Sequence, residues 1–132
     1  MLRSPKIKGI EMESVQPVFT VKSIYDAVDW YQDVLRFETT FLNEEPGEAD
    51  SANYAVLRNG NAGLHLGLER DMQNEAGQGS CNFLTKDFDE THRRAQDAGV
   101  TFYIELGTIP TGERTFGIKD PDGNQITFVE AS

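Results

Sequence analysis

The chain has 132 residues, which suits one globular domain with a single core. Twelve basic and twenty-two acidic residues give a net charge of −10, which argues against nucleic acid as a partner because phosphate contacts need cationic side chains. No apolar run approaches the ~20 residues of a membrane span, and the start lacks the apolar core of a secretory signal. A single cysteine excludes an internal disulfide. We therefore expect a cytoplasmic protein without membrane partners.

Much of the acidic excess lies in two stretches that we expect to be loops, residues 43–51 and 69–75. Acidic loops keep a protein soluble, and they can also attract a cationic ligand to the mouth of a pocket. The composition supports both interpretations.

The first half of the chain is expected to contain one helix among four strands. Residues 1–13 form a polar tail or include an edge strand at 7–12, and a strand is predicted at 16–21. Ser23 is a good helix N-cap, and the apolar residues after it recur with helical spacing. These apolar residues are Ile24, Ala27, Val28, Tyr31, Val34 and Leu35. Further strands are predicted at 37–42, 53–58 and 62–68.

The second half repeats this order. Asp87 is the expected N-cap of a second helix, 64 residues after Ser23, and Gly99 is its expected C-cap. The predicted strands lie at 80–85, 101–106, 115–119 and 125–130. An internal repeat outranks local propensity as evidence. The chain is therefore predicted to be α+β, with two tandem βαβββ modules, at 14–69 and 79–132, joined by a linker at 70–78 and forming an open, cleft-shaped barrel.

The run Asp120-Pro121-Asp122-Gly123-Asn124 predicts a tight turn before the last strand, because its residue types favour chain reversal. This turn and the segment Val21–Phe37 together resemble the vicinal oxygen chelate superfamily, which includes glyoxalases, extradiol dioxygenases and bleomycin-resistance proteins. The resemblance covers residues 16–130 and implies two paired βαβββ modules. Arg36 departs from the family pattern, which has glycine after the helix; a left-handed backbone there would cost roughly 1 kcal/mol.

Catalytic members of this superfamily hold one divalent metal ion on inward-facing strand positions. The resemblance places Gln16, His65, Ser80 and Thr127 at those positions. A catalytic metal needs about three good protein ligands, and only His65 is a strong one. We therefore expect no metal cofactor, and a single divalent ion on His65 and Gln16 is the alternative.

Other segments are more similar to the bleomycin-resistance branch. They are Gln16–Val18, Leu64–Leu66, Ser80–Cys81 and Asp120–Val129. Those proteins are acidic, metal-free homodimers that sequester a cationic antibiotic in clefts between subunits. The resemblance thus implies a homodimer that binds a small molecule without turnover, with a cationic antibiotic as one candidate ligand and no catalytic residue.

The residues expected to contact the ligand are polar and alternate along predicted strands. They are Gln16, His65, Ser80, Asn82 and Thr127. The alternative function is a divalent-metal-dependent lyase, isomerase or dioxygenase. A structural or interaction protein with an unused cleft is a third interpretation that the sequence leaves open.

Overall fold

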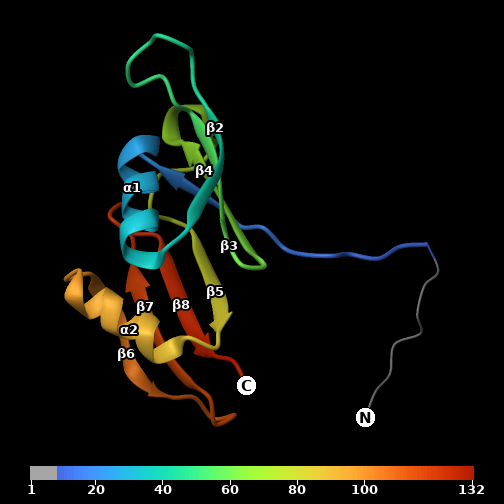
Figure 1. The fold of residues 1–132 in the computed structure, drawn as a ribbon, viewed down its shortest axis with the longest axis vertical. Coiled ribbons are helices and arrows are strands. Elements are labelled where there is room, and N and C mark those ends of the chain that lie inside the picture. The colour runs from blue at the N-terminus through green and yellow to red at the C-terminus, as the bar shows by residue number, and fades with distance from the viewer. Residues whose placement is uncertain (1–8) are drawn as a thin grey trace.

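A computed structural model describes residues 9–132, and its elements follow the predicted order (Figure 1). Module one contains β1 (Val18–Val21), α1 (Ile24–Leu35), β2 (Glu38–Asn43), β3 (Tyr54–Asn59) and β4 (Ala62–Leu68). A short 3-10 helix, η1 (Glu69–Asp71), follows. Module two contains β5 (Ser80–Thr85), α2 (Phe88–Asp97), β6 (Thr101–Thr108), β7 (Arg114–Lys119) and β8 (Gln125–Glu130). Within residues 9–132, no helix is long and apolar enough to cross a membrane.

Both modules have the same sheet topology. Sheet one has the strand order β1-β4-β3-β2 and sheet two has β5-β8-β7-β6, with the first and last strand of each module pairing in parallel. Val18 lies opposite His65 in sheet one, and Asn82 lies opposite Thr127 in sheet two, so these pairs are equivalent. The sheets remain separate, and the fold is the predicted α+β arrangement of two tandem βαβββ modules.

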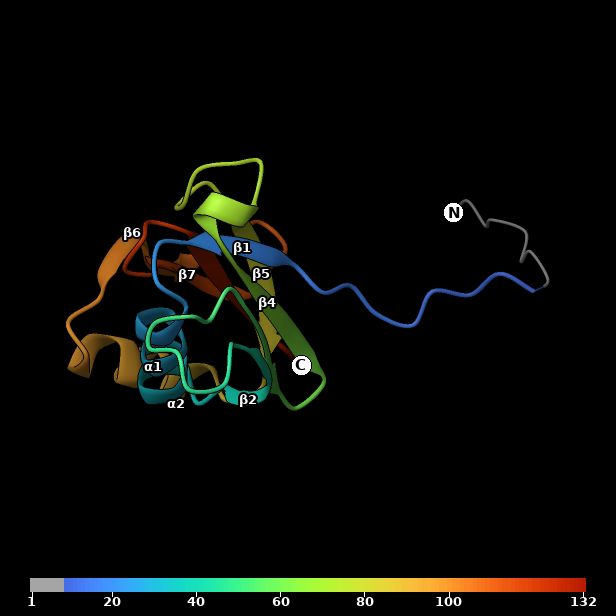
Figure 2. The same ribbon diagram turned by 90° about the horizontal axis from the view of Figure 1, so that it is seen from above.

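Each helix covers one face of its sheet. All six apolar residues predicted for α1 are buried, and so are Phe88 and Ala95 of α2. The helices contact each other on one side of the molecule (Figures 1 and 2). Arg94 of α2 strengthens this contact by donating to the carbonyl oxygens of Asp33, at 2.6 Å, and Val34, at 3.1 Å, in the last turn of α1. The opposite face of each sheet, called here its free face, has no helix over it.

The helix ends test the predicted caps. Ser23 Oγ accepts a hydrogen bond from the backbone N–H of Asp26 at 3.2 Å, which confirms the first cap. Asp87 directly precedes α2 as predicted, but its side chain makes no capping hydrogen bond. Arg36 adopts the left-handed backbone with φ 62°. Gly99 is also left-handed, with φ 68°, two residues after the end of α2.

The predicted turn before β8 also joins the two modules. Asp120, which is 5% exposed, accepts hydrogen bonds from two backbone N–H groups of its own turn and, at 2.8 Å, from the Tyr31 hydroxyl of α1. Asn124 is fully buried and donates to the backbone oxygen of Thr20 in β1 at 3.1 Å. Its Oδ1 accepts from the Gly79 N–H at 2.8 Å. One turn of module two thereby satisfies polar groups of β1 and α1.

Several segments differ from the sequence-based expectation. The first strand begins at Val18 and not at Gln16, so Gln16 lies just before the strand. Of the edge strand considered at 7–12, residues 7 and 8 lie outside the described residues, and residues 9–12 form no strand. The linker packs against module one, because a Cβ atom added to Gly67 would lie 2.6 Å from Met72 Sδ. The Thr20 hydroxyl also donates to Asn74 Oδ1 at 2.9 Å. The linker therefore covers one end of the free face of sheet one.

Candidate functional site

The two free faces carry all the residues predicted to contact a ligand. In each strand, alternate side chains point away from the helix, so the free face combines polar groups with exposed apolar ones. Val18 and Phe41 of sheet one are 42% and 52% exposed, and Leu84 of sheet two is 72% exposed. Apolar groups surrounding a few polar ones are typical of small-molecule sites.

His65 lies at the centre of the free face of sheet one, with both ring nitrogens in hydrogen bonds. Its Nε2 lies 2.7 Å from Gln16 Oε1, and its Nδ1 lies 2.7 Å from the Tyr54 hydroxyl. Because Gln16 Oε1 can only accept, Nε2 carries the proton, and a neutral imidazole then accepts at Nδ1 from Tyr54. Partial burial raises the pKa of Tyr54, which keeps its hydroxyl protonated as this arrangement requires.

Two glycines of β4 leave room for side chains from other segments. Gly63 and Gly67 flank His65 on the same face of the strand. A Cβ atom on Gly63 would lie 3.2 Å from Cγ of Gln16, so the glutamine lies directly over the glycine backbone. Gly63 therefore lets Gln16 reach the imidazole, whereas the space over Gly67 is filled by Met72.

The equivalent place in sheet two holds hydroxyl groups. Asn82 and Thr127 are direct partners in the parallel β5–β8 pair, and Ser80 is two residues before Asn82 on the same face. The Thr127 hydroxyl is hydrogen-bonded to the Tyr103 hydroxyl. A Cβ atom on Gly117 would lie 2.6 Å from the Tyr103 ring, so this tyrosine also lies over a glycine.

The structure therefore assembles the predicted residues into two sets. Gln16 and His65 contact each other in sheet one, and Ser80, Asn82 and Thr127 lie together in sheet two. No side-chain hydrogen bond among residues 9–132 joins the two sets. Sequence reasoning missed two members of the sets, Tyr54 and Tyr103. The alternation of side chains in the predicted strand at 53–58 could have suggested that Tyr54 lies on this face. Near Tyr103 the pairing of β6 shifts register, so alternation does not predict which face its side chain joins.

The donor groups do not fit the divalent metal ion of the catalytic relatives. His65 has both nitrogens in hydrogen bonds, Gln16 is a weak neutral ligand, and the equivalent centre in module two offers the Thr127 hydroxyl. No group of three histidine, cysteine or carboxylate side chains with metal-binding geometry occurs within residues 9–132. A resident divalent ion would usually have at least one carboxylate or thiolate to offset its charge.

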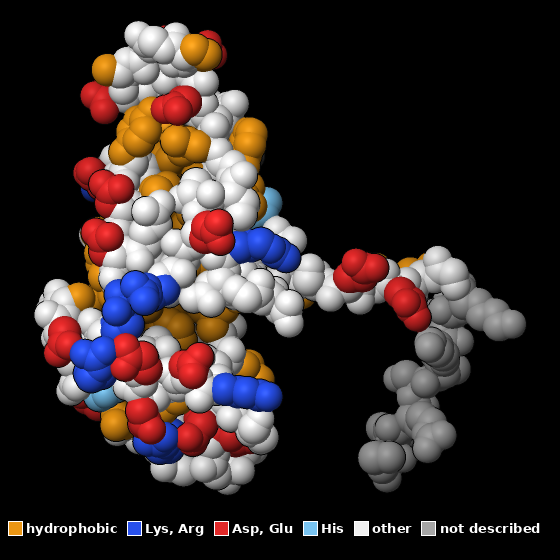
Figure 3. Space-filling view, in the orientation of Figure 1, with side chains coloured by type: hydrophobic (Ala, Val, Ile, Leu, Met, Phe, Trp, Pro, Cys, Tyr) orange, Lys and Arg blue, Asp and Glu red, His pale blue; other side chains and the backbone are white. Residues whose placement is uncertain are grey.

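The acidic loop at 43–51 lies against α1. The Tyr25 hydroxyl of α1 donates to Glu44, and the loop lines an open hollow together with Tyr25. Figure 3 shows acidic side chains on this loop at the upper end of the molecule. The loop therefore borders a hollow beside α1, not the centre of the free face at His65.

Comparisons with known proteins agree with this architecture. The model of the glyoxalase/bleomycin resistance protein/dioxygenase superfamily matches residues 14–128. The chain belongs to this superfamily. No curated protein sequence matches it.

Several solved structures are similar to this member of the superfamily. A superfamily protein from Sphaerobacter thermophilus is 27% identical, with a TM-score of 0.75 over 91% of this chain and 98% of that one. A bleomycin-binding protein from Streptomyces verticillus, solved with copper(II)-bleomycin, is 26% identical, with a TM-score of 0.71 over 93% and 99%. A lactoylglutathione lyase from Agrobacterium tumefaciens is 19% identical, with a TM-score of 0.72 over 92% and 96%, and shares the fold.

Proposed function

We propose that this protein binds a small organic molecule on its free faces, without turnover and without a metal cofactor. The observation that carries the proposal is the bonding of His65, whose nitrogens are both held by Tyr54 and Gln16. A histidine fixed in this way, opposite apolar Val18 and with Phe41 two strands away on the same face, suits a ligand-contacting surface better than a metal centre.

The polar contacts come from both sheets. Gln16 and His65 serve the ligand on one face, and Ser80, Asn82 and Thr127 serve it on the other. Gln16 has its Oε1 bonded to His65, so its amide N–H groups are the donors left for a ligand. Exposed apolar side chains on both faces support a homodimer, in which the free faces of two copies would be covered.

A cationic antibiotic is the first ligand to test. The net charge of −10 favours attraction of a cation, and the similar protein from Streptomyces verticillus is named for binding bleomycin. Sequestration of such a compound in the cytoplasm would protect the cell.

Isothermal titration of the chelator-treated protein with a bleomycin-type glycopeptide tests the proposal, with Asn82→Ala and Thr127→Val as site variants. Each lost hydrogen bond is expected to weaken binding by about fivefold to tenfold, or roughly 1 kcal/mol. Glu48→Gln, in the exposed loop beside α1, is the control and should bind as the wild type does. Absence of binding to this compound and to a broad library of cationic compounds would refute the antibiotic assignment.

A metal-dependent lyase, isomerase or dioxygenase is the second candidate. The contact between Gln16 and His65 is the observation that favours it, since both of its proposed ligands lie together. Uptake of one ion per chain that disappears in His65→Ala would support this candidate over sequestration.

A further inference from the structure

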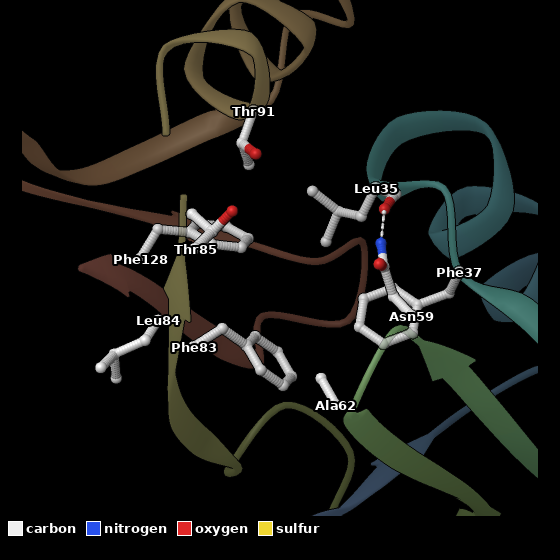
Figure 4. A pocket seen from close by; sticks show the side chains of 9 residues that line it. All are labelled: Leu35, Phe37, Asn59, Ala62, Phe83, Leu84, Thr85, Thr91 and Phe128. Carbon is white, nitrogen blue, oxygen red and sulfur yellow. Dashed lines mark hydrogen bonds between the residues drawn. The ribbon is translucent and has the colours of Figure 1, made fainter. Parts of the chain in front are cut away.

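A separate cavity lies where the two modules meet, away from His65 and Thr127. It has a volume of about 90 Å³ (Figure 4). Module one contributes the end of α1 and the β3–β4 hairpin, and module two contributes the end of β5, the first turns of α2 and part of β8. In the space-filling view, apolar side chains are visible between the two modules, with charged side chains around them (Figure 3).

The floor of this cavity is aromatic. Phe37 and Phe83 have ring centroids 5.7 Å apart, and Phe83 and Phe128 have centroids 6.1 Å apart, so three rings from both modules form one surface. Ala62 presents only a methyl group beside them, which leaves the space open (Figure 4). An apolar cavity of about 150 Å³ can hold benzene when fully enclosed, and this smaller cavity also opens to solvent, so a single ring can enter it partly.

Two polar groups at the wall retain hydrogen-bonding capacity. Asn59 donates from Nδ2 to the Leu35 backbone oxygen at 3.0 Å, which leaves its Oδ1 as an acceptor. Thr85 Oγ1 accepts from the Asp87 N–H at 3.0 Å, and its own hydroxyl hydrogen has no acceptor within residues 9–132. The cavity thus offers one acceptor and one donor on opposite sides (Figure 4).

The charged side chains near the cavity balance one another, so they favour neither a cation nor an anion. A neighbouring hollow that shares Leu35, Asn59, Thr85 and Thr91 with the cavity is also lined by charged residues. Those residues are Arg36, Asp87, Glu90 and Arg94, two of each sign. A neutral ligand therefore encounters no net charge beside the cavity.

We propose that the cavity between the modules binds a small uncharged aromatic molecule bearing a hydroxyl group, such as a simple phenol. Its ring contacts Phe37, Phe83 and Phe128, and its hydroxyl group uses the free donor of Thr85 or the free acceptor of Asn59. A hydroxyl group is both donor and acceptor, so it suits either partner. This site shares Leu84 with the free face of sheet two, but it contains none of the polar residues proposed to contact a ligand on the free faces. It is therefore independent of the function proposed for them.

Ligand-observed NMR and thermal melting with phenol and toluene test the proposal on the full chain. Phenol should bind and raise the melting temperature. Ala62→Leu, which fills the cavity, should weaken phenol binding by at least about tenfold, whereas Ala49→Leu in an exposed loop should leave it unchanged. Melting of each variant without ligand checks that it is folded.

Two comparisons separate this site from others. Thr85→Val should weaken phenol binding severalfold with little effect on toluene, because it removes the hydroxyl and keeps the shape. His65→Ala should leave phenol binding unchanged, since His65 lies on a free face. Failure of phenol to bind at about 10 mM, ten times a Kd of about 1 mM, would overturn the proposal. Equal binding to wild type and Ala62→Leu, or loss of phenol binding in His65→Ala, would also overturn it. Equal effects of Thr85→Val on both ligands would overturn the role of its hydroxyl.

Discussion

Tyr31→Phe tests the connection between the modules, because it removes one oxygen atom and leaves the ring. The Tyr31 side chain is completely buried, and its hydroxyl donates to Asp120 Oδ2 at 2.8 Å. A hydrogen bond to a charged group contributes about 1.5–3 kcal/mol, so we expect a loss of about 2 kcal/mol in the free energy of unfolding. For a domain of this size, that corresponds to a fall of roughly 6–10 °C in melting temperature.

Urea denaturation followed by circular dichroism measures this change directly. Tyr25→Phe is the matched control, because it makes the same chemical change on the same helix, where the hydroxyl bonds Glu44 at the exposed surface. The control should lose less than about 0.5 kcal/mol. A change of the same small size in Tyr31→Phe would refute the claim that this bond joins the modules.

The same bond also predicts a dependence on pH. Burial, and then the nearby Asp120 carboxylate, raise the pKa of Tyr31 well above its ordinary value. The unfolded chain, whose tyrosines ionise near pH 10, therefore releases this proton first, and stability falls as the pH rises above about 10. Tyr31→Phe should lose less stability than the wild type between about pH 9 and pH 11.

Three further predictions concern single positions. Arg36→Gly should raise the free energy of unfolding by about 0.5–1 kcal/mol in urea denaturation, because glycine adopts the left-handed backbone without strain; a decrease would contradict this. Arg94→Met should lower the free energy of unfolding by about 1–2 kcal/mol, since two hydrogen bonds to α1 are lost. The control Arg93→Met, whose ion pairs are exposed, should lower it by less than about 0.5 kcal/mol. Equal losses would count against the role of Arg94 between the helices. Burial raises the pKa of the Cys81 thiol to about 12. Alkylation of Cys81 at pH 8 should therefore be about a thousandfold slower than that of a free thiol, and it should accelerate as the pH rises. Fast labelling of the folded chain would contradict the burial of Cys81.

The periodic parts of the fold could be predicted from the sequence. The six apolar residues of α1 recur at helical spacing, and all of them are buried. Ser23 caps α1 through its own side chain, which is a local interaction. The strand at 62–68 has the predicted bounds because its leucines alternate without interruption. Local patterns of this kind depend little on distant parts of the chain.

Features that depend on tertiary contacts were harder to predict. The linker looked polar, but Met72 packs on Gly67, and only the fold shows that this glycine leaves room for it. The side chain of Asp87 lies at the expected cap position without making the cap bond. A sequence shows which residue types are present, whereas the packing of neighbouring elements decides which of them interact.

The candidate site also combines features that the sequence predicts with contacts that only the fold shows. The resemblance to the superfamily selected Gln16, His65, Ser80 and Thr127, and the structure places Gln16 beside His65 and Asn82 opposite Thr127. Tyr103 lies over a glycine of a neighbouring strand, close to a change of register in β6. Such a contact between strands cannot be read from the period of either one.

The central claim is that the free faces bind their ligand without a metal ion, and metal content per chain tests it most directly. The protein would be incubated in turn with Fe(II), Mn(II), Ni(II) and Zn(II), desalted thoroughly and measured by elemental analysis, with His65→Ala treated in parallel. The donor set around His65 predicts far less than one equivalent of every metal, and no difference between the wild type and His65→Ala. Close to one equivalent in the wild type, lost in His65→Ala, would contradict the account and identify a metal-dependent site.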